Sequence, residues 1–374
     1  MDVLIVAGEA SGDLHAAAVA AALAERRPDL RLVGVGGPRM RAAGVDLIED
    51  VASTAVMGFA EVLAHVPRHL LLLRALRARI RSGRVALLIC VDYPGFNLRL
   101  ADAAHAAGVA VLYYITPQVW AWGARRLPRM ARVVTRAAVI LPFELPLLRA
   151  RGIDATFVGH PLLDQAATLP DRAAARAALG LDPDAPVLAL LPGSRAQEIA
   201  HHLDPFVATA HAVVRSRPDT VVIVSEAPGV GIDRARCPFR VVPGGSFVAL
   251  RAADAALCKS GTTTLDAAVA GCPLVVAYRT NRWTYAIARR VVTIPDIGLV
   301  NVVAGRRVAQ EFVQDALVPE TVAAALVPLL DHGSAERARV LAGLAEVRGM
   351  LGTPGAAARV AAMADEMTRG ARSA

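Results

Sequence analysis

The sequence lacks the long apolar segments of a membrane-spanning protein, and it contains little cysteine. No run of about 18 uninterrupted apolar residues occurs, and Met1-Asp2 leads directly into a short strand-like run. We therefore predict neither a spanning helix nor a secretory signal. The four cysteines stand singly, without the paired spacing of a zinc site or a redox motif, and the nine histidines form no cluster at ligand spacing. We expect a protein kept in the cytoplasm, with reduced cysteines and no metal or other cofactor.

Acidic residues are fewer than basic ones, 33 against 41, which gives a net charge of +8 and a pI near 10.0. This balance favours an anionic partner, and a nucleic acid, an anionic membrane surface or a phosphorylated substrate would each fit. Base bias in a genome also produces an arginine-rich chain, so charge alone does not choose among them. The length of 374 residues indicates two domains.

Short apolar, β-branched runs alternate with Ala-, Arg- and Leu-rich stretches, the pattern of buried parallel strands joined by crossover helices. The strand-like runs cover residues 3–7, 32–35, 85–91, 109–115 and 139–141, then 187–191, 220–224, 255–258 and 274–277. We predict two Rossmann-like, doubly wound α/β domains, residues 1–165 and 166–350, with a ligand between them at the carboxyl ends of their strands. The remaining residues, 351–374, are expected to form a helix that packs back on the first domain.

The window 62–84 is both leucine-rich and basic. Six apolar residues follow helical spacing: Val62, Val66, Leu70, Leu73, Leu76 and Ile80. Arginines crowd the remaining positions, at 68, 74, 77, 79, 81 and 84. A basic amphipathic helix with surplus leucine can lie on an anionic bilayer. A crossover helix packed on the sheet, with solvated arginines, is the alternative that this window alone favours.

In the first half, two strand ends carry residues suited to binding or chemistry. Residues 8–13 (GEASGD) form a glycine-containing turn into a helix, where free N–H groups can meet an anion or a sugar hydroxyl. The glycines do not have the G-x-G-x-x-G spacing of a nicotinamide-binding site, and a tight turn that needs glycine is the structural alternative. Asp92 follows the strand 85–91 and can accept a proton as a general base, or it can cap the next helix.

In the second half, two turns suit a diphosphate. Gly193, Ser194 and Arg195 follow the strand 187–191, and a guanidinium binds phosphate through two parallel hydrogen bonds. Residues 259–264 (KSGTTT) place hydroxyls and N–H groups at a predicted helix start, with Ser260, Gly261 and Thr262 foremost. Asp266 can reach ribose hydroxyls from that helix or simply stabilise its first turn. Such a site, with a base on the other half, suffices for metal-free glycosyl transfer, and His160 is the histidine of interest beside the domain junction.

Ordered motifs along nearly the whole chain resemble those of the lipid-A-disaccharide synthase family. They are AGEASGD (7–13), GVGGPRM (34–40), Met57-Gly58 with Glu61, VDYPGFN (91–97), ITPQVWAW (115–122), LPFE (141–144), VGHP (158–161), LPGSR (191–195), SGT (260–262) and NVVAG (301–305). Each motif is weak by itself, but their joint order is specific.

This resemblance implies an inverting GT-B glycosyltransferase of lipid A and lipopolysaccharide biosynthesis. It would join UDP-2,3-diacylglucosamine to 2,3-diacylglucosamine 1-phosphate, releasing UDP and forming a β-1,6 disaccharide. The first domain would be the acceptor and membrane side, and the second the donor side. The enzyme would be peripheral on the inner face of the inner membrane, would use no nucleic acid, and is a candidate homodimer.

The resemblance also assigns roles to residues of this chain. Asp92 would be the catalytic base and Arg195 a diphosphate ligand, and the residues implied in the donor site further along are Asn301, Glu311 and Gln314. Ser11, Gly12 and Met57 would face the acceptor. The family's contact with the membrane shifts the interpretation of window 62–84 toward membrane binding, through Leu70, Leu73, Arg74, Arg77 and Arg81. Asp266 departs from the usual glutamate by one methylene, which leaves its ribose contact open.

Two alternatives keep the same architecture. Another UDP-sugar transferase or a UDP-sugar epimerase would retain Arg195 and the Ser260 loop, but it would have no obvious use for residues 115–122 or for the basic helix. A non-catalytic protein that binds nucleotide sugars at the membrane surface would tolerate the loss of Asp92, which is present here.

Overall fold

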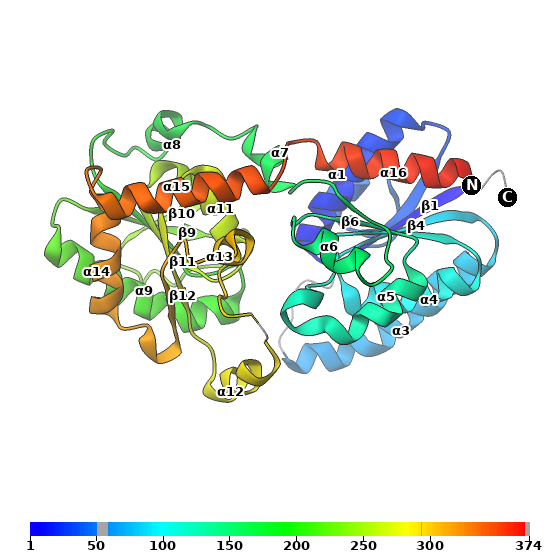
Figure 1. Ribbon diagram of the computed structural model, residues 1–374, viewed down its shortest axis with the longest axis horizontal. Coiled ribbons are helices and arrows are strands. Elements are labelled where there is room, and N and C mark those ends of the chain that lie inside the picture. The colour runs from blue at the N-terminus through cyan, green and yellow to red at the C-terminus, as the bar shows by residue number, and fades with distance from the viewer. Residues whose placement is uncertain (51–58, 293, 371–374) are drawn as a thin grey trace. The chain divides into compact units, whose positions relative to one another are not determined.

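The computed structural model describes residues 1–50, 59–292 and 294–370. The chain divides into two compact units, Met1–Pro161 together with Thr353–Ala374, and Leu162–Gly352. The chain therefore leaves the first unit once and returns to it once (Figure 1).

The first unit is built on a parallel sheet of seven strands. These are β1 (Asp2–Ala7), β2 (Arg31–Gly36), β3 (Asp46–Asp50), β4 (Val85–Val91), β5 (Ala110–Tyr114), β6 (Arg136–Val139) and β7 (Ala155–Phe157). Their order is β3-β2-β1-β4-β5-β6-β7. The central strands β1 and β4 are buried along their whole length, as expected for strands covered by helices on both faces.

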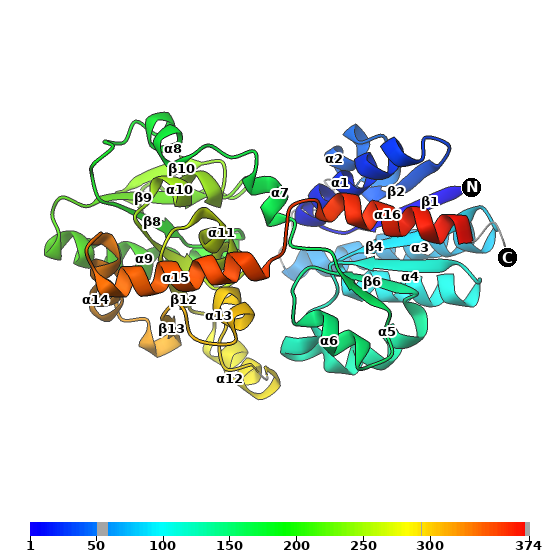
Figure 2. The same cartoon turned by 45° about the horizontal axis from the view of Figure 1, so that its top comes forward.

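Helices cover both faces of this sheet (Figures 1 and 2). They are α1 (Ala10–Arg26), α2 (Pro38–Ala42), α3 (Phe59–Arg81), α4 (Pro94–Ala106), α5 (Leu127–Val133), α6 (Glu144–Arg149) and α16 (Ala356–Gly370). One apolar cluster joins the sheet to α1, α2 and α16, and the other joins it to α3, α4, α5 and α6. Because successive side chains of a strand point to opposite faces, Leu4 belongs to one cluster and Ile5 to the other.

The last helix, α16, lies beside α1 in both views (Figures 1 and 2) and packs against it. Arg27 donates from Nη1 to Asp365 of α16 at 2.9 Å, and Arg359 donates from Nε to the carbonyl oxygen of Val158 at 2.8 Å. Helix α16 is therefore part of the core of the first unit.

The second unit has a parallel sheet of six strands. They are β8 (Val187–Leu191), β9 (Val221–Glu226), β10 (Arg240–Pro243), β11 (Ala255–Lys259), β12 (Leu274–Tyr278) and β13 (Glu311–Val313), in the order β10-β9-β8-β11-β12-β13. Its helices are α7 (Leu162–Ala166), α8 (Arg172–Ala178), α9 (Ala196–Ser216), α10 (Ser246–Ala252), α11 (Thr263–Ala270), α12 (Arg282–Val291), α13 (Leu299–Ala304), α14 (Pro319–Leu330) and α15 (Ala335–Met350). The doubly wound α/β class predicted from the sequence is confirmed for both units.

Each sheet reverses its strand order at one place, between β1 and β4 in the first unit and between β8 and β11 in the second. Loops that leave the carboxyl ends of two such strands turn to opposite faces of the sheet, so a crevice opens between them, and ligands of doubly wound folds bind there. The strand order therefore singles out four loops: those after β1 and β4 in one unit, and those after β8 and β11 in the other.

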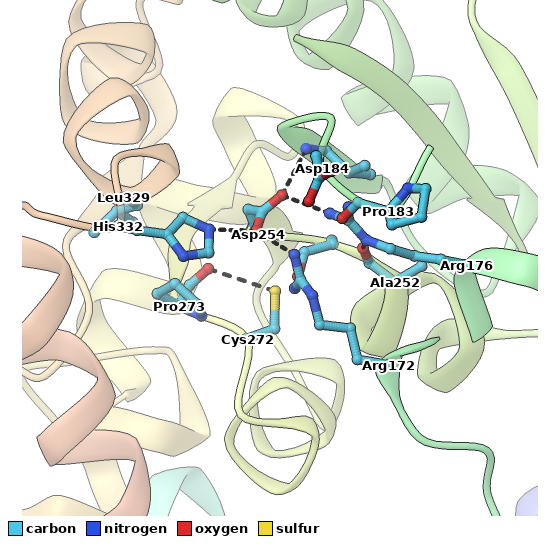
Figure 3. A network of polar contacts seen from close by, with 12 residues as sticks. Arg172, Arg176, Pro183, Asp184, Ala252, Asp254, Cys272, Pro273, Leu329 and His332 are labelled. Carbon is cyan, nitrogen blue, oxygen red and sulfur yellow. Dashed lines mark hydrogen bonds and ion pairs between the residues drawn. The ribbon is translucent and has the colours of Figure 1, made fainter. Parts of the chain in front are cut away.

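A buried charge network closes the opposite, amino end of the second sheet (Figure 3). Asp254 immediately precedes β11 and is 1% exposed. Its Oδ2 accepts hydrogen bonds from the N–H of Val187 at 2.8 Å and from Nη2 of Arg176 at 2.7 Å, and its Oδ1 is contacted by Arg172 and, at 2.8 Å, by His332. This one carboxylate thus ties helix α8 and the segment after α14 to the strand starts of β8 and β11.

Candidate active site

Asp92 lies at the carboxyl end of β4, in the crevice of the first sheet, and is exposed. Its backbone has a φ of 47° and that of Tyr93 has a φ of 49°, the left-handed region that side chains other than glycine seldom adopt. The carbonyl oxygen of Asp92 accepts from Nδ2 of Asn97 at 2.8 Å and from Oη of Tyr113 at 2.8 Å, and its N–H donates to the carbonyl oxygen of Tyr114 at 3.0 Å. These bonds fix the main chain of Asp92 in a strained conformation, which is common at functional sites.

The loop after β1 forms the other side of this crevice. Gly8, Glu9 and Gly12 line a small hollow together with residues 91–93. A Cβ added to Gly8 would lie 2.3 Å from the ring of Tyr93, so only glycine fits against that ring. The predicted acceptor residues Ser11, which is exposed, and Gly12 lie in the first turn of α1, beside this hollow. Met57, the third, lies outside the described residues.

Hydrogen bonds join two of the sequence motifs to each other. The carboxylate of Asp13 is 3% exposed and accepts from the N–H groups of Gly37 at 2.7 Å, Arg39 at 3.1 Å and Met40 at 3.1 Å. A Cβ on Gly37 would lie 2.8 Å from that carboxylate. The first helix turn of the GEASGD motif is thus fixed by the GVGGPRM motif.

The ITPQVWAW and LPFE motifs meet at a buried carboxyl group. Glu144 is 3% exposed and accepts from the N–H of Leu141 at 3.1 Å, from Nε1 of Trp120 at 3.3 Å and from Oγ1 of Thr116 at 3.4 Å. Burial raises the pKa of Glu144 to about 7, although these hydrogen bonds oppose the rise. Ile115 has a φ of 58°, and a π-helical turn, η2 (Val119–Gly123), follows. Glu144 therefore anchors an irregular segment that leaves β5, the neighbour of β4.

His160 lies in the first unit and is 5% exposed. Burial, with a smaller contribution from His15, lowers the pKa of His160 to about 3, so its ring is neutral near pH 7. Burial also lowers the pKa of His15 to about 4. The ring of His15 lies edge-to-face with that of Tyr114 in β5, 6.4 Å between centroids.

In the second unit, Arg195 is the N-cap of α9 and its side chain is 65% exposed. The N–H of Ser194 donates to Oε2 of Glu198 at 2.9 Å, and Arg195 Nη1 contacts Oε1 at 3.4 Å. Lys259 at the end of β11 donates from Nζ to the same Oε1 at 2.7 Å. Gly193, with a φ of 140°, allows the loop to pass Glu198 closely. The KSGTTT turn includes Lys259, the only lysine in the chain, but its sequence indicates no separate role for Lys259 and does not point to Glu198.

The loop after β11 forms the other half of this crevice. Ser260 donates from Oγ to the carbonyl oxygen of Ile297 at 2.7 Å, Gly261 has a φ of 145°, and Thr262 is the N-cap of α11. Asp266 is 7% exposed, and its Oδ2 accepts from Oγ of Ser246 at 2.6 Å. Burial raises the pKa of Asp266 to about 6. Asp266 thus joins α11 to α10, and its contact in this structure is a serine of the protein.

Three side chains predicted in the donor site form hydrogen bonds within the loops around this crevice: Asn301, Glu311 and Gln314. Asn301 is 1% exposed: its Nδ2 donates to Oε1 of Glu311 at 2.7 Å and to a main-chain carbonyl, while its Oδ1 accepts two main-chain N–H groups. Glu311 also accepts from the N–H groups of Ile297 and Gly298, both at 2.9 Å. Gln314 is bonded through both amide atoms to the main chain of Thr280. Since the Asn301 amide is satisfied by the chain, its contribution to the site is to hold this loop.

Helix α3 has a buried apolar face, as a crossover helix has, and it also has exposed leucines and arginines, which membrane binding would require. Leu73, Leu76 and Ile80 are at most 5% exposed and pack in the core, which corrects the expectation that Leu73 faces a membrane. Leu70 and Leu71, in contrast, are 46% and 63% exposed. On the same helix, Arg74 and Arg81 are exposed, whereas Arg77 is half-buried and donates to the carbonyl oxygen of Arg99 at 3.3 Å.

Within the ranges given above, no helix is long and apolar enough to cross a membrane. Among the same residues, no group of three or more His, Cys, Asp and Glu side chains is placed to hold a metal ion.

Comparison with known proteins places this geometry in a family. The family model for lipid-A-disaccharide synthetase matches residues 3–346. The chain is 41% identical over 370 residues to a lipid-A-disaccharide synthase of Syntrophus aciditrophicus, covering 97% of this chain and 96% of the relative, and 42% identical over 367 residues to that of Myxococcus xanthus, covering 96% and 95%. Among solved structures, the calicheamicin glycosyltransferase CalG4 superposes with a TM-score of 0.64 at 18% identity, covering 98% of both chains. This last likeness concerns the fold, which is of the GT-B type.

Proposed function

The chain belongs to the lipid-A-disaccharide synthase family and is a glycosyltransferase of lipid A biosynthesis, and we propose that it joins UDP-2,3-diacylglucosamine to 2,3-diacylglucosamine 1-phosphate. The observation that carries this proposal is the pair of sites at the two reversals of strand order. One presents a carboxylate, Asp92, on a rigid turn, and the other presents cations and N–H groups around Arg195. Glycosyl transfer needs one of each.

In the proposed reaction, the 6-hydroxyl oxygen of the acceptor attacks the anomeric carbon of the donor. The bond from that carbon to the diphosphate oxygen breaks, the glycosidic bond forms with inversion, and Asp92 takes the hydroxyl proton. UDP leaves with the electron pair of the broken bond. Arg195, the N–H of Ser194 and the start of α11 at Thr262 stabilise the charge that builds on the diphosphate.

The test is an assay of the purified protein with both substrates in detergent. We expect UDP release and a disaccharide 1-phosphate product that depends on both substrates. Absence of UDP release by a folded protein would refute the assignment. Release of UDP from the donor alone would instead favour an epimerase or a hydrolase of the same fold.

Asp92→Asn separates catalysis from binding. It removes the base but leaves the second unit unchanged, so we expect turnover to fall by about 100-fold or more, the typical contribution of a positioned general base, with the Kd for UDP unchanged. Asp102→Asn, which alters an ion pair between α4 and α5, is the matched control and should retain turnover. Equal turnover in Asp92→Asn and the wild type would exclude the role.

We further propose that α3 rests on the inner face of the inner membrane through Leu70, Leu71, Arg74 and Arg81. Their exposure on one helix supports this contact, since apolar side chains flanked by cations favour an anionic bilayer surface. Arg74→Gln with Arg81→Gln should weaken binding to vesicles containing phosphatidylglycerol, more at low salt than at high salt. Arg26→Gln with Arg348→Gln removes the same charge from α1 and α15 and should bind as the wild type does; equal losses in the two pairs would contradict a specific surface.

A further inference from the structure

Lys259 is the one lysine in a chain that otherwise carries 40 arginines as its basic side chains. An ammonium and a guanidinium are not equivalent, because the ammonium is compact, carries a localised charge and points three donors in different directions. The single side-chain ammonium of this protein belongs to the last residue of β11, at the reversal of strand order in the second sheet. Lys259 therefore lies where a doubly wound fold binds its ligand.

The Lys259 ammonium lies between two helix starts. Its Nζ is 2.7 Å from Oε1 of Glu198 in the first turn of α9, and both side chains are 16% exposed. A Cβ built on Gly261, which precedes α11, would be 3.4 Å from the same Nζ. One cation thus reaches both loops of the crevice.

The carboxylate of Glu198 pairs with these positive groups, so the protein itself supplies an anion to this crevice. The carboxylate accepts from the N–H of Ser194, from Lys259 and from Arg195. Burial alone would raise the pKa of Glu198, but the bond to Lys259 and the other donors hold it below its usual range, so the carboxylate is charged near pH 7. With one anion against two cations, this cluster has a net charge of +1.

A nucleoside-diphosphate sugar carries one negative charge on each phosphate. Added to the cluster as it stands, it would place three anionic groups around two cations. If the Glu198 side chain rotates away, two cations face two phosphates and the charges match. Charge balance therefore favours an exchange in which an anion of this kind replaces Glu198 on these donors.

We propose that Lys259 is a ligand of the donor diphosphate, and that the diphosphate displaces the carboxylate of Glu198 from Lys259, Arg195 and the N–H of Ser194 when it binds. The inference rests on the UDP-sugar donor of the proposed function and adds to it a residue and an exchange of partners. Glu198 also suits a simpler role, because an acid three residues after an N-cap commonly accepts main-chain N–H groups at a helix start.

The first experiment measures UDP binding by calorimetry. Lys259→Met should weaken UDP binding about 10- to 150-fold, the factor that corresponds to one hydrogen bond to a charged group. UMP, which lacks the second phosphate, is the matched ligand and should lose less. Glu198→Gln keeps a side chain of the same shape without its charge and should bind UDP more tightly than the wild type.

The double variant Lys259→Met, Glu198→Gln separates contact from charge balance. If Lys259 only neutralises Glu198, removing both charges restores the affinity of Glu198→Gln, and the proposal fails. If Lys259 contacts the diphosphate, the double variant stays at least about tenfold weaker than Glu198→Gln. Thermal unfolding of each variant without UDP establishes that the fold is intact.

The second experiment measures the reactivity of Lys259, which is possible because the chain has no other lysine. Acetic anhydride modifies the amino terminus and the single ε-amine, and peptide mass spectrometry follows Lys259 alone. UDP should slow this acetylation while leaving the amino terminus unaffected, and Glu198→Gln without UDP should react faster than the wild type. An acetylation rate of Lys259 that UDP does not change would overturn the proposal.

The outcomes for this inference and for the proposed function differ. Wild-type protein that fails to bind UDP would overturn both. Suppose instead that the wild type binds UDP and releases it from the two substrates while Lys259→Met binds UDP equally well. That result would overturn the role of Lys259 alone.

Discussion

Replacing Asp254 by Asn should destabilise the second unit without altering its ligand site. The carboxylate is 1% exposed and accepts from the main-chain N–H of Val187 and from the guanidinium of Arg176, itself only 4% exposed. Besides Arg176 and Arg172, the guanidinium of Arg337 donates to the main-chain carbonyl oxygen of Asp254 at 2.5 Å. The amide of Asn keeps the shape of the carboxyl group but points an N–H₂ at one of these donors and removes the negative charge.

The expected loss follows from burial. Removing one partner of a buried ion pair costs about 3–5 kcal/mol, because the remaining charge stays uncompensated. His332 and Arg172 add less, since their side chains are 68% and 41% exposed and solvent screens them. For a unit of this size, about 2–4 °C per kcal/mol gives a fall in Tm of roughly 6–20 °C.

The measurement is calorimetric unfolding, with UDP affinity determined in parallel at a temperature where the variant is folded. Asp204→Asn is the control: its ion pair with Arg236 is in the same unit, but Asp204 is 65% exposed, so a loss below about 1 kcal/mol is expected. The Kd for UDP should be unchanged in both, because Asp254 lies at the amino ends of the strands and the site at their carboxyl ends. A loss for Asp254→Asn no larger than that of the control would refute the reasoning.

Three further outcomes are expected in the first unit. Burial raises the pKa of Glu144 from 4.5 to about 7, so the folded state binds this proton more tightly than the unfolded state, and ionisation lowers stability as pH rises from about 4.5 through 7. Glu144→Gln should therefore remove up to about 3 kcal/mol of that decline in the unfolding free energy, and parallel pH profiles for the two proteins would contradict this. Tyr113→Phe removes one hydrogen bond to the Asp92 carbonyl, so we expect a loss of about 1 kcal/mol in denaturant unfolding and a lower kcat; an unchanged kcat would mean that the other contacts suffice. Gly8→Ala should lower kcat with UDP binding retained, because the new methyl group displaces the ring of Tyr93, and wild-type turnover would disprove that steric argument.

The strands that sequence patterns did not predict share one position in the fold. β3 and β7 are the edges of the first sheet, and β10 and β13 are the edges of the second. An edge strand is covered incompletely, and these four contain half-buried or exposed residues in place of a continuous apolar run. The nine predicted strands correspond to the interior strands, whose burial on both faces requires an apolar sequence. For β6 the predicted run 139–141 is displaced, since it shares only Val139 with the observed strand.

The sequence predicts those residues of the candidate site that lie just after a buried strand. Asp92 and Arg195 could be found because each follows a buried strand that is visible in the sequence. The partners of Asn301 and Asp266 could not, since these side chains bond to other segments of the chain that no sequence pattern connects with them. The role of Lys259 could not be predicted for a different reason. It depends on the ion pair with Glu198, which is 61 residues away in sequence, although the two side chains are 2.7 Å apart.

The return of the chain to its first unit has a consequence for the order of synthesis and folding. The apolar cluster under α1 includes Val360, Ala361, Met363 and Ala364 of α16. A nascent chain that has emerged from the ribosome only to Gly352 holds all of the second unit, yet the first unit still lacks a helix of its core. Although the first unit is begun first, it is completed last. Until then the part of α1 that packs against α16 stays open to water and to other nascent chains.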